Sequence, residues 1–260
     1  MRIAAIAITT FREEVRRKVF LFLLLFAAVM IATSWIFSFF TGSEEMKIVK
    51  DMGLSSIQLA GVIIAMVMGI RMIPGEIDKR TIYAILSKPV TRTEYLLGKF
   101  LGGALTLAAN TAVMGTLFML VVAVKSHQVQ PPQPVDFRLL EQVLLAYVQF
   151  CLLLAMTLMF STFLTPIMNG SISLFVLIVG NLSDTLLDII RMSKSVMVEI
   201  GLRVLYYVIP NWQNFSVQDA LVRGDEAIPL SYVAKIVLYG VLYTVALLII
   251  ATQAFHNQEV

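Results

Sequence analysis

The sequence has little of what most soluble domains contain. Its single cysteine, Cys151, excludes a disulfide within the 260 residues. Its two histidines, His127 and His256, are too far apart in the chain to supply a histidine-rich metal site. Charged residues make up only 14% of the chain, against about 25% in soluble proteins. The net charge of +3 does not argue for nucleic acid. We therefore expect no catalytic site, no metal site and no nucleic-acid partner.

Hydrophobic residues take the place of the missing charged residues. They account for 58% of the chain, and the mean hydropathy is +0.85. This composition predicts an all-α integral membrane protein with one transmembrane domain over residues 1–260. The first apolar run has 22 residues and spans about 33 Å as a helix, enough to cross the hydrocarbon core. It is too long for the apolar region of a signal peptide, so we interpret it as a retained span.

The apolar runs predict six transmembrane helices. They are Val19–Phe40, Leu54–Ile73, Phe100–Val124, Leu139–Leu164, Ile167–Leu187 and Tyr232–Ala254. Residues 1–18 and 74–99 each hold five Lys or Arg residues, whereas 41–53 and 125–138 each hold two. Because cytoplasmic loops are enriched in Lys and Arg, this asymmetry predicts a multi-pass protein of the inner (cytoplasmic) membrane with both termini in the cytoplasm.

The connection 184–230 between the fifth and sixth spans is the exception to this pattern. Its first part, 184–209, is long enough to cross but carries six charged residues, among them Asp184, Asp188 and Glu199. A charge at the bilayer centre costs about 2.5–3.5 kcal/mol, so a seventh crossing is disfavoured. We expect re-entrant or interfacial helices on the outer side instead.

Residues 1–18 have the pattern of a basic amphipathic helix. A helical projection gathers apolar side chains on one side, namely Ala4, Ala7, Ile8, Phe11 and Val15. Arg12, Arg16 and Arg17 lie opposite. This predicts a helix in the cytoplasmic membrane interface. An ordinary positively charged flank of the first span fits the same residues.

The polar segment 76–99, EIDKRTIYAILSKPVTRTEYLLGK, lies between two apolar runs. A short helix is predicted over 76–86 and is ended by Ser87-Lys88-Pro89, since the residue before a proline avoids α geometry. Thr91 or Thr93 can cap the next helix, in which Gly98 and Gly102 have the spacing that allows close helix packing. The 76–86 helix could be a lever for a soluble partner, or a solvated loop that rests on the membrane.

The residues EIDKRTIYAILSKPVTR (76–92), followed by EYLLGK (94–99), resemble the signature of ABC-transporter permeases of the type-2 exporter class. Within that class they are most similar to the multicopper-enzyme branch, typified by the nitrous-oxide-reductase maturation permease. Arg80-Thr81 departs from the commoner Gly-Thr form. The resemblance implies that 76–86 is a cytoplasmic coupling helix, that 1–18 is a connecting helix, and that 184–230 holds outer-side re-entrant helices.

The resemblance also implies a set of partners. A separate nucleotide-binding ATPase subunit, in two copies, would bind ATP and Mg, and a second permease copy would complete a homodimer. The residues implied to dock the ATPase subunit are Glu76, Lys79, Arg80, Thr81, Tyr83, Leu86 and Arg92. Gly98-Lys99 is not a P-loop, because Thr93 and Phe100 occupy positions that require Gly and Ser or Thr. We therefore expect no cofactor in this chain and no enzymatic activity of its own.

Three functions remain open on the sequence. The first is a permease subunit that couples ATP hydrolysis to export, with Asn110 and Asn181 lining a substrate path. Polar residues within spans also form hydrogen bonds between helices, which is the alternative role for both asparagines. The second function is a mechanotransmission subunit that relays ATPase motion to an extracytoplasmic accessory protein. The third is a secondary transporter that needs no ATPase.

Overall fold

The computed structural model describes residues 2–38, 44–75, 91–129, 134–192, 196–223 and 228–256, and in these ranges it contains helices and no strand. The elements are α1 (Arg2–Val15), α2 (Lys18–Ser38), α3 (Glu45–Arg71), α6 (Arg92–Gln128), α7 (Leu139–Ser161), α8 (Pro166–Asn181), α9 (Ser183–Met192), α10 (Val196–Val208), η2 (Gln213–Phe215), α11 (Gln218–Arg223) and α12 (Leu230–His256).

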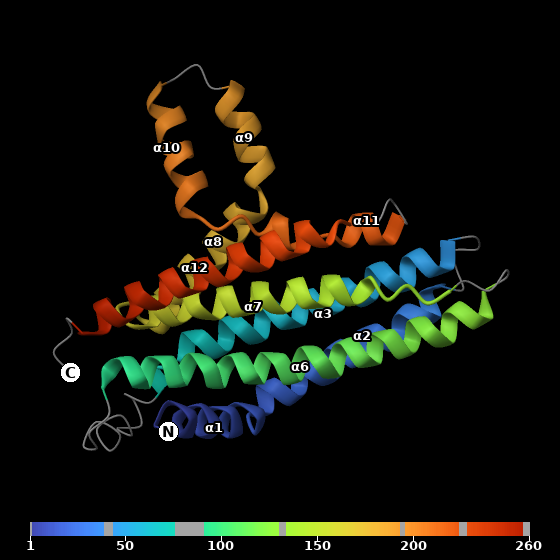
Figure 1. The fold of residues 1–260 in the computed structure, drawn as a ribbon, viewed down its shortest axis with the longest axis horizontal. Helices are drawn as coiled ribbons and strands as arrows, with labels where there is room; N and C mark the ends of the chain where they lie inside the picture. Colours follow the sequence, from blue (N-terminus) through green and yellow to red (C-terminus); the bar gives the residue numbers. More distant parts are fainter. Residues whose placement is uncertain are drawn as a thin grey trace.

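Helix α7 is the centre of the bundle. The long helices α3, α6, α7 and α12 run side by side (Figure 1). In α7, 72% of the most apolar stretch is buried, against 56% in α3, 39% in α6 and 33% in α12. Helices α3, α6, α8 and α12 pack against α7, and α2 packs against α3 and α6. The outer helices therefore keep large apolar faces exposed, as expected where lipid is the solvent.

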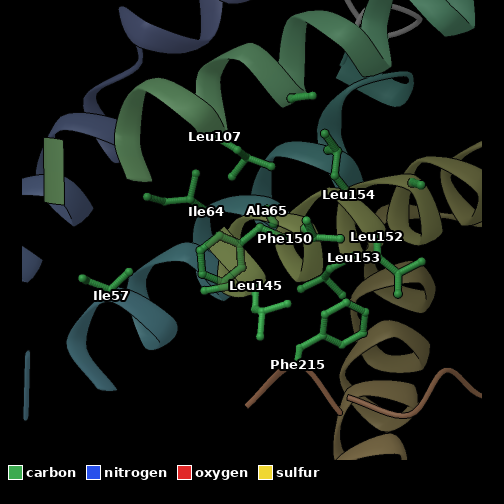
Figure 2. Close-up of a cluster of buried hydrophobic side chains, with 14 of the residues drawn as sticks. Ile57, Ile64, Ala65, Leu107, Leu145, Phe150, Leu152, Leu153, Leu154 and Phe215 are labelled. Atoms are coloured by element: carbon green, nitrogen blue, oxygen red, sulfur yellow. The ribbon is translucent and has the colours of Figure 1, made fainter. Parts of the chain in front are cut away.

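Glycines on the neighbouring helices receive the large side chains of α7. The glycines whose Cβ positions abut α7 are Gly61 and Gly69 of α3, Gly103 and Gly115 of α6, and Gly240 of α12. Gly61 lies against the ring of Phe150, and Gly240 lies against Val148. Lipid tails are as apolar as leucine, so helices in a bilayer associate through such close packing. Figure 2 shows the resulting core, with Leu145, Phe150 and Leu153 of α7 among Ile64 of α3, Leu107 of α6 and Phe215.

Four of the six predicted spans are confirmed as helices long and apolar enough to cross a membrane. They are α3, α6, α7 and α12. The first predicted span falls on α2, whose described apolar part, Leu23–Phe37, is shorter than a crossing requires. That crossing stays a prediction. The fifth, Ile167–Leu187, falls on α8 and the start of α9, which are apolar and long enough only when taken together and bend by 69° after Asn181. Whether this bent pair crosses stays a prediction.

The break after α8 has a cause that lies far away in the sequence. The backbone N–H of Trp212 donates to the carbonyl of Gly180 at 3.2 Å, where a continuing helix would place its own donor. In the first turn of α9, the backbone N–H of Asp184 donates to Oε1 of Gln213 at 3.1 Å. Both groups are thus satisfied by the returning chain, which allows the helix to stop inside the bundle.

The short helices α9 and α10 form a hairpin. Helices α9 and α10 have 10 and 13 residues, and each is too short to cross a bilayer. They pack on each other and project away from the long helices (Figure 1). Some of their charged side chains form ion pairs with a residue one helical turn away, as Arg203 does with Glu199 at 2.7 Å. The position of the hairpin on the outer side stays a prediction.

Gly61→Ala is expected to destabilise the protein. The new methyl group would meet the ring of Phe150 in a packed core. Overpacking of this kind costs about 1–3 kcal/mol, whereas alanine gains only about 1 kcal/mol in helix propensity. Thermal unfolding of the purified protein in detergent should show a lower midpoint than wild type.

The matched control is Gly201→Ala in the exposed helix α10, where no heavy atom lies within 4 Å of the added methyl group. This variant should unfold at or slightly above the wild-type midpoint. Equal midpoints for the two variants would contradict the packing of α3 on α7 described above.

Candidate functional site

One end of the bundle gathers four segments that are far apart in the sequence. Helix α1 begins there, α3 ends, α6 begins and α12 ends (Figure 1). Arg2 and Glu94 come within 4.0 Å, and the guanidinium of Arg92 donates to the carbonyl of Phe255 at 2.6 Å. We call this region the terminal end of the bundle. The predicted docking segment connects α3 to α6 and is therefore attached here at both of its ends.

Most of the predicted docking residues cannot be placed. The coupling helix 76–86, with Glu76, Lys79, Arg80, Thr81, Tyr83 and Leu86, lies outside the residues that the structure describes. Arg92 is described, and its side chain is directed at the last turn of α12.

Helix α6 starts at a well-formed cap. The hydroxyl of Thr91 accepts from the N–H of Glu94 at 3.2 Å, and the carboxylate of Glu94 accepts from the N–H of Thr91 at 2.9 Å. This reciprocal capping box is one of the two caps expected from the sequence. It fixes where the docking segment ends and the helix begins.

Cationic and aromatic side chains alternate just inside this cap, and we call the four residues the cation–aromatic ladder. The guanidinium of Arg92 lies 5.6 Å from the ring centroid of Phe255, and this ring stacks on Tyr95 at 6.1 Å. The ammonium of Lys99 lies 5.8 Å from the centroid of Tyr95. Both rings are 1% exposed and Lys99 is 5% exposed. The contacts of half-buried Arg92 and of Tyr95 with Phe255 join α6 to α12, while Lys99 packs on Tyr95 within α6.

Helix α1 is fastened to the same part of α6. A methyl group on Gly98 would lie 2.7 Å from Ile6, and one on Gly102 would lie 2.6 Å from the carbonyl oxygen of Ala7. The predicted close packing at these two glycines is therefore confirmed, with α1 as the partner.

Helix α1 buries Ala7, Thr10 and Glu14, whereas Ile8 is 48% exposed. It therefore packs on α6 through small residues at close range, and Ile8 lies outside this contact. The position of α1 in the membrane interface stays a prediction. Glu14 is buried beside Arg17, at 3.2 Å.

Ion pairs tie the opposite end of the bundle. Lys125 of α6, 1% exposed, pairs with Glu45 of α3 at 2.5 Å. In the loop before α7, burial raises the pKa of Asp136, but hydrogen bonds from Arg138 outweigh it and the pKa lies below its usual value. Lys50 approaches the same carboxylate at 3.9 Å. This end holds α3 to α6 and to the loop before α7.

The two candidate path residues lie in different surroundings. Asn110 of α6 is 1% exposed, and neither its amide nitrogen nor its amide oxygen has a hydrogen-bond partner among the described residues. Asn181 is exposed at the end of α8 and donates to the carbonyl of Leu177 at 2.9 Å. The structure of one chain therefore does not bring the two side chains together.

Sequence reasoning missed three of the four ladder residues. Tyr95 and Lys99 belong to the motif EYLLGK, but nothing in the motif indicates that they are buried. Phe255 comes directly after the end of the predicted sixth span. The one available signal was an aromatic residue at the end of an apolar run. Such a residue is usually interpreted as a membrane-interface anchor, which does not predict a buried contact with another helix.

Two comparisons with known proteins bear on this site. The family model described as ABC-2 family transporter protein matches residues 4–260. No curated protein gives a significant match to the chain. The match supports a permease of this type, and the narrower multicopper-enzyme branch stays a prediction.

Phe255→Leu is expected to loosen the terminal end. Leucine keeps much of the buried area but removes the stack on Tyr95 and the cation–π contact with Arg92, which together are worth about 1–3 kcal/mol. The thermal midpoint in detergent should fall, and Phe255→Tyr should retain most of the wild-type value. Phe175→Leu, at a position 56% exposed on α8, is the matched control. If the thermal midpoint of Phe255→Leu equals that of the control, the cation–aromatic ladder does not stabilise the protein and this prediction is wrong.

Proposed function

Because the chain belongs to the ABC-2 family of transporter proteins, we propose that it is the membrane-spanning permease subunit of an ATP-driven exporter. A separate nucleotide-binding subunit binds ATP and Mg and hydrolyses the ATP. The chain supplies the path and the moving helices. Its one Gly-Lys pair, Gly98-Lys99, stands in a packed helix against α1 and not in a phosphate-binding loop, which supports this division of labour.

The observation that carries the proposal is the construction of the terminal end. The segment 76–90 joins α3 to α6, and the first turns of α6 are fixed to α12 by the ladder and to α1 by close packing. A partner that displaces this segment therefore displaces several helices together. Rigid-body movement of packed helices is a common way to transmit a switch through a protein.

The assembly that we propose has two permease copies and two ATPase subunits. It lies in the inner (cytoplasmic) membrane, with both chain termini on the cytoplasmic side. The positive charge of 1–18 and 74–99 supports this orientation. The meeting of α1 and the end of α12 at one end of the bundle agrees with it. The docking residues are those named above, from Glu76 to Leu86, and Arg92 links them to α12.

The α9–α10 hairpin favours a second candidate function. It projects from the bundle and exposes large apolar side chains, with Met192 of α9 81% exposed and Met197 of α10 85% exposed. A mechanotransmission subunit would use such a hairpin to move an extracytoplasmic partner. The two functions share the ATPase subunit and differ in whether a substrate crosses.

The proposed partnership can be tested by affinity purification. The tagged chain, extracted from its native membrane in mild detergent, should bring with it a subunit that carries a P-loop and hydrolyses ATP. Purification of the chain without an ATPase, together with full function in a strain that lacks every candidate ATPase subunit, would establish an ATP-independent transporter instead.

The double variant Glu76→Ala/Tyr83→Ala is expected to lose the captured ATPase subunit and to fail in a complementation assay, while membrane insertion stays intact. Its matched control is Glu44→Ala/Tyr232→Ala, since Glu44 is exposed in an ion pair with Lys47 before α3 and Tyr232 is exposed in the first turn of α12. Normal complementation by the first double variant would contradict docking through 76–86.

Phe255→Leu is expected to give a different defect. The ATPase subunit should still be captured, because the docking residues are unchanged, but complementation should weaken since α6 and α12 are no longer fastened. ATP hydrolysis by the purified complex should continue. Loss of ATPase capture by this variant would place Phe255 in the docking surface rather than in the transmission of movement.

A further inference from the structure

An apolar pocket of about 430 Å³ lies on the side of the bundle, and none of the four ladder residues lines it. It is framed by α7, α8, α12 and the returning chain after α10. Its lining residues are Met156, Met159, Phe160, Val176, Val208, Ile209, Pro210, Tyr243, Ala246, Leu247 and Ile250. The volume falls within the range of about 300–1,000 Å³ that is usual for small-molecule sites.

The pocket has a buried floor and an exposed rim. On the floor, Met156 is 2% exposed, Ile209 is 7% exposed and Leu247 is 8% exposed. On the rim, Val208 is 65% exposed and Ile250 is 51% exposed. The pocket therefore opens onto the outer face of α12 and does not lie sealed inside the bundle.

Among the described residues that line the pocket none is charged, and the single hydroxyl among them is already used. The hydroxyl of Tyr243 donates to the carbonyl of Val208. A water molecule needs two to four polar partners, so an apolar cavity of this kind stays dry. A polar or charged ligand would also lose its hydration without compensation.

We propose that this pocket binds an acyl chain of a bilayer phospholipid. The rim residue Ile250 is 51% exposed on α12, a helix long enough to cross the membrane. Hydrocarbon chains are therefore the medium at the mouth of the pocket. The flexible side chains of Met156 and Met159 can adapt to a chain of variable conformation.

The bound chain supports the return of the hairpin into the bundle. Ile209 and Pro210 connect α10 to Trp212, the residue whose N–H ends α8 at Gly180. Ile209 and Pro210 line the pocket, beside Val208, whose carbonyl accepts the hydroxyl of Tyr243. An acyl chain in the pocket completes the packing behind this turn. The inference concerns the isolated permease and does not depend on the proposed ATPase partner.

The test uses photolabelling of the full chain in vesicles of phosphatidylethanolamine and phosphatidylglycerol. The probe is a phosphatidylethanolamine with a diazirine within one acyl chain, and labelled peptides are mapped by mass spectrometry. We expect adducts to concentrate on the lining residues of α7 and α12, including the buried Met156. Adducts spread evenly over the exposed faces of α2, α8 and α12 would overturn the proposal.

The matched variants are Ala246→Phe and Ala234→Phe. Both alanines are exposed on α12, but only Ala246 lines the pocket, so a ring there fills the site from its rim. Labelling of the lining peptides should fall about tenfold in Ala246→Phe, which corresponds to about 1.4 kcal/mol, and stay at the wild-type level in Ala234→Phe. Unchanged labelling in a correctly inserted Ala246→Phe protein would overturn the proposal. Cross-links from Ile250→Cys to a second copy of the chain, with no lipid adduct at Met156, would show that another protomer fills the pocket and would also overturn it.

Discussion

The bundle depends on how closely α7 is packed by its neighbours. Most of this helix is buried, and glycines of the helices around it meet its side chains, namely Val143, Val148, Phe150, Leu154 and Thr157. In a bilayer, burial of apolar surface gives little net gain when helices associate, so close contact must supply the stability. The glycines of α3, α6 and α12 therefore determine how each of these helices packs on α7. The arrangement of the helix ends depends on this packing.

The two ends of the bundle are fastened by different interactions. Away from the termini, the buried pair Lys125–Glu45 joins α6 to α3. At the terminal end, Arg92 and Tyr95 of α6 hold Phe255 of α12, while Gly98 and Gly102 hold α1. Helix α6 is the element shared by both ends. A displacement applied where α6 begins can therefore reach α12 and α1 directly, and α3 through the packing along its length.

Much of the fold could be predicted from local patterns, because long apolar runs alone determine where α3, α6, α7 and α12 lie in the sequence. The Thr91 cap and the close packing at Gly98 and Gly102 were also visible, since capping and small-residue spacing are short-range signals. The end of α8 was not, because it depends on a hydrogen bond from Trp212, some thirty residues later. The ladder was also out of reach, since Arg92 and Phe255 are 163 residues apart and no local pattern pairs them.

We propose that α6 and α12 move as one body when the proposed ATPase partner acts on the segment 76–90. Pulsed EPR between spin labels at Thr93→Cys and Gln253→Cys, both exposed near the ladder, tests this directly in the assembled complex. Cys151 is replaced by alanine, and labelled chains are diluted with unlabelled ones so that the signal reports distances within one copy. We expect a narrow distance distribution that is the same with and without ATP and broadens in Phe255→Leu. A distance in the otherwise unchanged protein that shifts when ATP binds would contradict it.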